Sequence, residues 1–298
     1  MTELALVERI RRRAGKSRAM VLGIGDDCAI YQPAPGEQLL FTTDLLIEDI
    51  HFLRGTHKAA DCGWKALARG LSDIAAMGGM PRFCLVSLAV PEWATDRWVN
   101  GFYDGLLKLA ALHKTTLAGG DLSRADKLLC DIVVCGSVPL GKALRRDGAK
   151  TGDGIYVSGA LGASALGLAT GKGAAFRRHL RPEPRLKLGI ALREKLHATA
   201  AMDLSDGLSL DLHRLCTASG VAADLNGDLP IWGGATPAQA LHGGEDYELL
   251  FTVPSGVKVP SQISGIPLTR IGEVVRGKPG AMRIAGLHLH PLGHDHFR

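Results

Sequence analysis

Aromatic residues are scarce in this sequence, at 5% of 298 positions, and basic residues are scattered except at positions 11–13 and 145–146. A nucleic-acid-binding surface usually combines a basic stripe with aromatic side chains that stack on bases. We therefore expect no nucleic-acid partner. The net charge of +5 suits a small anionic ligand at least as well.

Long apolar runs are also missing, since none approaches the roughly 20 residues that a membrane helix needs. Residues 1–13 carry Glu3 and Glu8 and lack the unbroken apolar core of a signal peptide. The six cysteines form no Cys-x-x-Cys pair, and most lie in apolar runs, which predicts reduced, buried thiols. We expect a cytoplasmic protein that does not associate with membranes.

The chain alternates predicted strands with predicted helices, which indicates an α/β fold. A prior of about 150 residues per domain allows two domains. The linker is expected at residues 139–153, which are rich in Gly, Lys and Arg. The sequence thus predicts domains at 1–140 and 141–298. The main predicted strands are 21–24, 38–43, 83–90, 115–118, 128–138 and 155–157, and the main predicted helices are 64–75, 96–113, 163–169 and 185–197.

Acidic residues recur beside glycines or at predicted strand ends. The first such stretch places Asp26 and Asp27 behind Gly23 and Gly25, where backbone can approach a ligand closely. Five more follow, at residues 42–44, 71–73, 119–121, 203–206 and 243–246. Adjacent carboxylates repel each other, so this repetition predicts one acidic site that attracts cations.

Individual acidic residues in these stretches also have simpler interpretations. Asp73 falls off the apolar stripe of its predicted helix and, taken alone, is better explained as part of a solvated face. Asp206 could equally complement a helix dipole. Ser205 is a candidate N-cap for the helix that follows.

The number of carboxylates favours magnesium. This ion prefers oxygen ligands and is usually held by a few carboxylates together with substrate phosphates. Five or more acids predict several Mg²⁺ ions and a highly anionic ligand such as a nucleoside triphosphate. Phosphoryl transfer, which depends on positioning and charge neutralisation, is then the leading reaction class.

Two other motifs are weaker. Residues 136–143 nearly fit the phosphate loop, but Ala143 replaces the hydroxyl residue and Pro139 removes a backbone donor. Four histidines between His288 and His296 do not have the spacing of a tetrahedral zinc site.

Taken together, eight motifs in order along nearly the whole chain resemble the thiamine-monophosphate kinase family. They are Gly23-Ile-Gly-Asp-Asp-Cys28, Thr42-Thr-Asp44, His51-Phe52, Leu71-Ser-Asp-Ile-Ala-Ala-Met-Gly78, Gly119-Gly-Asp121, Asp203-Leu-Ser-Asp-Gly207, Gly243-Gly-Glu-Asp-Tyr-Glu248 and Asp295-His-Phe297. No single motif is specific, but the set is.

The resemblance implies the two-domain α/β fold of the aminoimidazole ribonucleotide synthetase-like superfamily. It implies a homodimer in which strands of both N-terminal domains form a shared barrel. Residues 1–140 would bind ATP and magnesium and dimerise, and residues 141–298 would complete the nucleotide and substrate cleft. The implied reaction is transfer of the ATP γ-phosphoryl group to the phosphate of thiamine monophosphate, the final step of thiamine diphosphate synthesis.

The resemblance also implies roles for individual residues. Magnesium ligands would be Asp27, Thr42, Thr43, Asp44, Asp73, Asp121, Asp203 and Asp206. ATP would contact Gly120, Asp121, Arg146 and Ser205, and thiamine monophosphate would contact His51, Glu245 and His294. The residues expected to act in catalysis are Asp44, Asp121, Arg146 and Asp206.

The sequence departs from the family pattern at two of these motifs. His294 stands where the family usually has Tyr or Trp, and Leu122 stands where it more often has Thr. Sibling enzymes fit less well. Selenophosphate synthetase needs an early reactive cysteine or selenocysteine, and this sequence has none before Cys28. The hydrogenase-maturation relative ends in a catalytic cysteine, whereas this sequence ends in Phe297-Arg298. A non-catalytic ATP- or metal-binding regulator would also retain the acidic residues, so that alternative stays open here.

Overall fold

The computed structural model describes residues 3–294 and contains two compact units. The first unit comprises the residues up to 74 together with 80–141, and the second comprises 75–79 and the residues from 142 onward. Each unit is built on its own sheet. Within the described residues, no helix has both the length and the apolar character needed to cross a membrane. The separate functional roles expected for residues 1–140 and 141–298 stay predictions.

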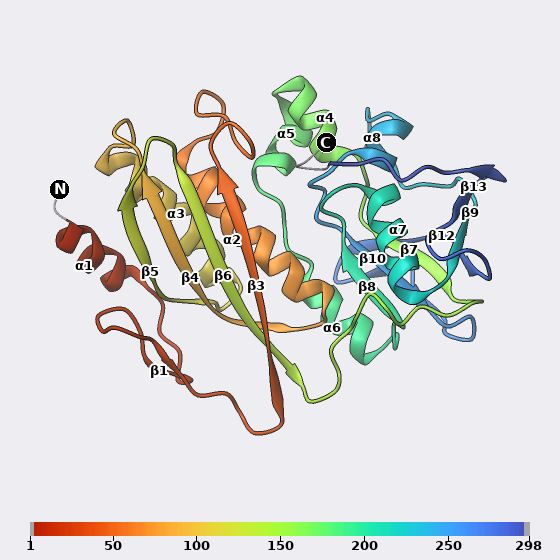
Figure 1. Cartoon of the computed structure of the whole chain (residues 1–298), viewed down its shortest axis with the longest axis horizontal. Helices are drawn as coiled ribbons and strands as arrows, with labels where there is room; N and C mark the ends of the chain where they lie inside the picture. Colours follow the sequence, from red (N-terminus) through yellow and green to blue (C-terminus); the bar gives the residue numbers. More distant parts are fainter. Residues whose placement is uncertain (1–2, 295–298) are drawn as a thin grey trace. The chain divides into compact units, whose positions relative to one another are not determined.

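The first unit is a four-stranded sheet in the order β3-β6-β4-β5, with β4 and β5 parallel and the other pairs antiparallel. Helices α2 and α3 cover one face of this sheet (Figure 1). The elements in chain order are α1 (Glu3–Arg13), β1 (Met20–Leu22), β2 (Ile30–Tyr31), β3 (Glu37–Ile47), α2 (Ala59–Ala76), β4 (Met80–Val90), α3 (Asp96–Leu112), β5 (Thr116–Arg124) and β6 (Leu129–Pro139).

The core of the first unit lies between the sheet and its helices. Leu67 and Leu71 repeat at helical spacing on α2, and both are fully buried, because this stripe faces the sheet. Thr95 begins α3 as an N-cap whose side chain accepts a hydrogen bond from Trp98 N. All six cysteines are free, and only Cys28 is exposed. The expectation of mostly buried thiols is therefore confirmed.

Two predicted strand ends are wrong. Asp44 was expected to end a strand, but β3 continues to Ile47 because its pairing with β6 extends over its whole length. Likewise, β5 runs through Gly119-Gly120-Asp121 to Arg124. Gly120, at φ 152°, permits this pairing, since a Cβ there would lie 1.9 Å from Val86 O.

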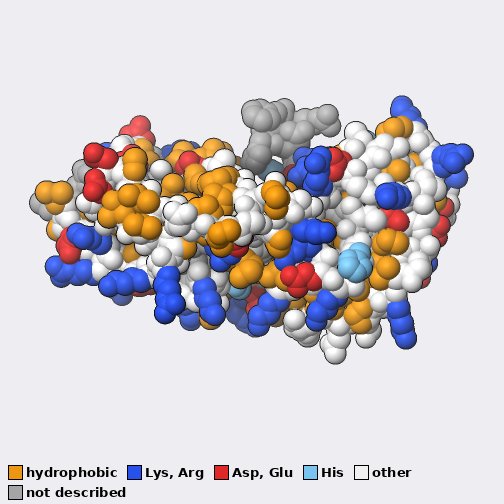
Figure 2. Space-filling model, turned by 90° about the horizontal axis from the view of Figure 1, so that it is seen from below, with side chains coloured by type: hydrophobic (Ala, Val, Ile, Leu, Met, Phe, Trp, Pro, Cys, Tyr) orange, Lys and Arg blue, Asp and Glu red, His pale blue; other side chains and the backbone are white. Residues whose placement is uncertain are grey.

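The other face of the first sheet carries exposed apolar side chains. Phe41 is 64% exposed and Leu45 is 45% exposed, and both alternate along β3 with residues that face the helices. Figure 2 shows hydrophobic side chains gathered on the part of the molecule that Figure 1 shows as the first unit. Exposed apolar side chains gathered on a sheet face are typical of an interaction surface.

The second unit is an eight-stranded sheet in the order β14-β13-β9-β12-β7-β10-β8, with β11 paired to β12. Its core includes Leu212 and Leu215 of α7 packed with Val157 and Ile271 of the sheet. The elements are β7 (Gly154–Ser158), α4 (Ala163–Thr170), α5 (Gly173–Leu180), α6 (Leu186–Glu194), β8 (Ala200–Asp203), α7 (Leu208–Ser219), β9 (Ala222–Leu225), α8 (Pro237–His242), β10 (Leu249–Val253), β11 (Gln262–Ile263), β12 (Ile266–Val275), β13 (Met282–Ile284) and β14 (Leu287–His288). The helix predicted for 185–197 is therefore shorter than expected and ends at Glu194.

Close contact between α2 and α3 leads to a prediction about stability. A methyl group at Gly105 would lie 1.8 Å from Ala60 O, whereas one at Gly101 on the same helix would lie 3.1 Å from Ala59 Cβ. Gly105→Ala should lower the free energy of unfolding by about 2 kcal/mol through overpacking. Gly101→Ala should change it by less than about 0.5 kcal/mol, because helix propensity offsets the tight contact. Urea unfolding of both variants measures this difference, and equal effects would contradict it.

Candidate active site

Strand β3 and helix α2 bring three polar side chains of the predicted site together. Thr42 and Asp44 alternate with exposed residues on β3, so both face α2. The Thr42 hydroxyl donates a hydrogen bond to the Asp73 carboxylate, and Arg69 Nη2 lies 3.0 Å from Asp44 Oδ1. Asp73 is half-buried. Its interpretation as a residue of a solvated helix face is therefore wrong.

Burial raises the pKa of Asp44 to about 6. The Arg69 guanidinium opposes this shift, whereas the nearby carboxylates of Asp73 and Asp131 add to it. One arginine thus compensates incompletely for several acids that are close in space. An additional cation would relieve the remaining repulsion, and a donor set made only of oxygen atoms suits magnesium.

Other predicted ligands lie on the opposite face of the same sheet. Thr43 follows Thr42 directly and therefore points away from α2, where its hydroxyl donates to Asp131 Oδ1 at 2.6 Å. Asp131 pairs with Ser87 across the sheet, and Ser87 pairs with Asp121. Asp121 is exposed. The predicted magnesium ligands of the first unit are thus divided between two faces.

Asp27 lies in the exposed turn after β1. Its backbone N–H donates to Asp26 Oδ1 at 2.9 Å. Gly25 adopts a φ of 126°, and a Cβ at this position would lie 3.2 Å from the Arg11 guanidinium carbon. The glycine therefore permits both the turn and the approach of an arginine to it.

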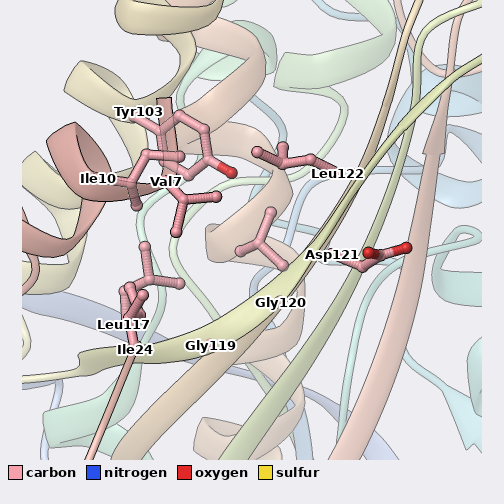
Figure 3. A pocket seen from close by; sticks show the side chains of 10 residues that line it. Val7, Ile10, Ile24, Tyr103, Leu117, Gly119, Gly120, Asp121 and Leu122 are labelled. Carbon is pink, nitrogen blue, oxygen red and sulfur yellow. The ribbon is translucent and has the colours of Figure 1, made fainter. Parts of the chain in front are cut away.

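A small apolar cavity of about 50 Å³ lies beside the strand that carries Gly120. Its lining includes Ile10 of α1 and Tyr103 of α3. Leu122 points toward these side chains, whereas Asp121 points away from them (Figure 3). Leu122 therefore contributes to apolar packing on the opposite side of the strand from the Asp121 carboxylate.

In the second unit, backbone hydrogen bonds join three of the predicted segments. Glu245 N donates to Ser205 O at 2.7 Å, and His294 N donates to Asp206 O at 3.1 Å. Asp203, at the end of β8, is 8% exposed. The side chain of Asp206 accepts from Arg214 of α7. Residues 203–206, Glu245 and His294 thus lie close together, and their separate roles toward magnesium, ATP and thiamine monophosphate stay predictions. The predicted motif residues 295–297 fall outside the described residues.

The expectation that Ser205 caps α7 is wrong. The helix begins after Gly207, which has a φ of 115° and no side-chain cap. Asp211 instead reaches back from the first turn, and its Oδ2 accepts hydrogen bonds from Asp206 N at 3.0 Å and Gly207 N at 3.1 Å. Ser205 is thus not needed as a cap.

Buried hydrogen bonds hold the acidic segment around Glu245. Asp246 accepts from the backbone N–H groups of Gly162 and Ser164 at the start of α4, at 2.6 and 3.0 Å. Burial raises the pKa of Asp246 to about 6, and these two donors partly oppose the rise. Glu248, 2% exposed, accepts from Ser158 Oγ at 2.5 Å.

Two arginines complete the environment of Glu248. Arg178 Nη2 lies 2.7 Å from Glu248 Oε1, and Arg185 Nε lies 2.8 Å from Glu248 Oε2. Arg185 donates a second bond to the same carboxylate through Nη2. Both guanidinium groups are largely buried, so the carboxylate and the arginines neutralise one another in a low-dielectric environment.

The remaining predicted residues are His51 and Arg146. His51 Nδ1, in the first unit, accepts from Ile47 N at 3.0 Å. Arg146, in the second unit, has an exposed side chain. Among residues 3–294, no three His, Cys, Asp or Glu side chains converge to form a metal site. The rings of His288 and His290 lie 4.4 Å apart.

Sequence reasoning missed the cations that compensate the acidic residues. Arg69 lies one helical turn before Asp73 on α2, so helical spacing could have indicated its place near the acids. Asp131 is the single acid in a mostly apolar strand, and this pattern could have indicated a place near the other acids. Arg178 and Arg185 lie more than sixty residues from Glu248 and were not detectable from local patterns.

Comparisons with known proteins give a consistent result. A family model described as AIR synthase related protein, N-terminal domain, matches residues 25–138. A thiamine-monophosphate kinase of Bacillus subtilis (strain 168) is 36% identical over 327 residues, which cover 100% of both chains. The acidic motifs of both units fall inside this full-length match.

Solved structures match as well. A thiamine-monophosphate kinase from Stenotrophomonas maltophilia K279a has a TM-score of 0.84 and 38% identity, covering 97% of this chain and 98% of its own. AaThiL complexed with AMPPCP and TMP has a TM-score of 0.81 and 34% identity, covering 99% and 97%. The hydrogenase maturation protein HypE of E. coli, at 21% identity and a TM-score of 0.76 over 98% and 96%, shares the fold alone. The predicted α/β fold of the aminoimidazole ribonucleotide synthetase type is confirmed.

The buried carboxylate of Glu248 leads to a test of the scaffold. Glu248→Gln should lower the free energy of unfolding by about 3 kcal/mol or more, because two buried guanidinium groups lose their counter-charge. Glu183 provides the control, since it lies 3.8 and 3.4 Å from the same arginines but is 69% exposed. Glu183→Gln should cost less than about 1 kcal/mol. Thermal and urea unfolding of the two variants measure the difference, and a Glu248→Gln protein as stable as the wild type would contradict the prediction.

Proposed function

We propose, since the chain belongs to the thiamine-monophosphate kinase family, that it transfers the γ-phosphoryl group of ATP to the phosphate of thiamine monophosphate. The products are thiamine diphosphate and ADP. The observation that carries this proposal is the match to a kinase of that name over the full length of both chains. The AaThiL structure with AMPPCP and TMP, which matches this chain at 34% identity, supports the same pair of substrates.

Magnesium is part of the proposal. The residues fit it because Asp44, Asp73 and Thr42 present only oxygen donors and because the charge of Asp44 is incompletely compensated. When bound, magnesium would neutralise phosphate charge in the transition state. The residues proposed to hold it are Asp27, Thr42, Thr43, Asp44, Asp73 and Asp121 from the first unit and Asp203 and Asp206 from the second.

The chemistry of the acceptor determines what the protein must supply. A phosphate monoester has a second pKa of about 6, so thiamine monophosphate is mostly a dianion at neutral pH and needs no general base. Its approach to ATP is opposed by repulsion between anions. The exposed Arg146 side chain is proposed to reduce that repulsion and to contact ATP together with Gly120 and Ser205. His51, Glu245 and His294 are proposed to contact the thiamine substrate.

Asp44 provides the direct test of this function. Purified protein with ATP, magnesium and thiamine monophosphate should form thiamine diphosphate and ADP in equal amounts. Thiamine should not replace thiamine monophosphate as the phosphoryl acceptor. Asp44→Asn should reduce kcat by about a hundredfold or more, because it removes a charge from the proposed metal site. The control is Asp104→Asn, a change at an exposed acid on α3 that pairs with Arg13. Chromatography of the products measures both.

Two outcomes would count against the proposal. If wild-type protein formed no thiamine diphosphate while it bound ATP in the presence of magnesium, the chain would be a sibling enzyme or a regulator. If Asp44→Asn and Asp104→Asn were equally active, the proposed metal site would be wrong while the reaction stood.

We also propose a homodimer formed through the open face of the first sheet. The exposed apolar side chains of Phe41 and Leu45 on a sheet face support it, because burying them against a second copy would remove apolar surface from water. A shared barrel between two such sheets is the form that this contact is proposed to take.

The homodimer predicts a specific change in molecular mass. Phe41→Asp should shift the protein toward a monomer, because a carboxylate would be buried in the interface without a partner. Leu112→Asp is the control, since Leu112 is 63% exposed at the end of α3, away from the open face. Light scattering after size-exclusion chromatography measures the mass. A monomeric wild type, or the same mass for both variants, would contradict this interface.

A further inference from the structure

A buried histidine lies beside the proposed substrate residue Glu245. His179, near the end of α5, is 2% exposed, and its ring stacks on Phe176 with centroids 6.0 Å apart. Its Nδ1 atom lies 2.8 Å from Ser164 Oγ and 3.4 Å from Glu245 Oε2. All of these residues belong to the second unit. None of the motifs identified in the sequence contains His179.

The neighbours of Nδ1 determine which ring nitrogen carries a proton. An unprotonated Nδ1 would direct its lone pair at the Glu245 carboxylate, which repels it. An N–H group at Nδ1 is attracted to that carboxylate and can also donate to Ser164 Oγ. The geometry therefore favours the tautomer with the proton on Nδ1. In this form, His179 presents a fixed donor to Glu245.

Hydrogen bonds hold the backbone around Glu245, and its side chain is partly exposed. Glu245 has a φ of 65°, in the left-handed region, and its N–H is bonded to Ser205 O. Its neighbour Asp246 is tied to the start of α4. The Glu245 side chain itself is 25% exposed. A donor buried behind a partly exposed carboxylate is well placed to fix the direction in which that carboxylate points.

We propose that His179 is a positioning residue, which orients the Glu245 carboxylate toward the thiamine moiety of the substrate. That moiety carries a thiazolium cation and an aromatic amine, and an oriented carboxylate recognises both by charge and by hydrogen bonding. The inference rests on the proposed function, in which Glu245 contacts thiamine monophosphate. His179 does not touch the substrate and acts through Glu245 alone.

The first test separates binding of the two substrates. His179→Leu should raise KM for thiamine monophosphate about tenfold, because the donor to a charged group is lost. KM for ATP and kcat should stay within about twofold of wild type, because Glu245 does not contact the nucleotide. His179→Asn, which keeps an amide donor near the position of Nδ1, should restore most of the affinity. His213→Leu is the control, since His213 bonds the Gly280 carbonyl at 2.9 Å elsewhere in the same unit.

The second test asks whether His179 acts through Glu245. In a Glu245→Gln background, His179→Leu should cause no further rise in KM for thiamine monophosphate, since the carboxylate it orients is already gone. If the leucine variant does not fold by circular dichroism, Ser164→Ala takes its place. This change removes the hydroxyl that fixes the same ring, and about a threefold rise is expected.

The outcomes distinguish this inference from the proposed function. An active wild type with an unchanged KM for thiamine monophosphate in the leucine variant would overturn the positioning role alone. Equal rises in KM for both substrates, or additive effects in the double variant, would also overturn it. A wild type that formed no thiamine diphosphate would overturn the proposed function and this inference together.

Discussion

Electrostatic compensation of clustered carboxylates is the constraint on which much of this structure depends. Acids placed close together repel one another, and each must gain a cation or a set of N–H donors if the fold is to hold them. The second unit supplies partners for its acids from its own residues, although burial still raises the pKa of Asp246 to about 6. Glu248 has two arginines, Asp246 has the first amides of α4, and Asp206 has Arg214.

The first unit meets the same requirement only in part. Arg69 pairs with Asp44, yet burial and the nearby acids Asp73 and Asp131 keep the pKa of Asp44 near 6. A raised pKa means that the charged form of the carboxylate is destabilised, and a bound cation would stabilise that form. Glu248 is paired with two buried arginines, whereas Asp44 has one arginine and two nearby carboxylates, and this difference favours Asp44 as a place where a further cation binds.

The sequence predicted the features that depend on local patterns. It did not predict the contacts that depend on residues distant in the chain. Helix α2 and strand β6 were found because apolar periodicity reports which face is buried. The division of Thr43 and Asp44 between two faces follows from the alternation of side chains along a strand, but motif matching assigned both residues to magnesium without using that alternation. The prediction that Ser205 caps α7 was wrong because the Asp211 carboxylate, within the helix, accepts from the N–H groups of Asp206 and Gly207. The resemblance named candidate acids but gave no information on which cations and N–H donors lie beside them.

The two departures from the family pattern, Leu122 and His294, can be understood from the contacts that each residue makes. Leu122 faces an apolar cavity while Asp121 faces the other way, so a change at the first need not alter the environment of the second (Figure 3). His294 is anchored through its backbone N–H to Asp206 O, a bond that does not depend on which side chain it carries. Gly293 makes that approach possible, because a Cβ there would lie 2.5 Å from the same carbonyl oxygen. The chain can therefore bring different side chains to this position while the backbone near Asp206 stays in place.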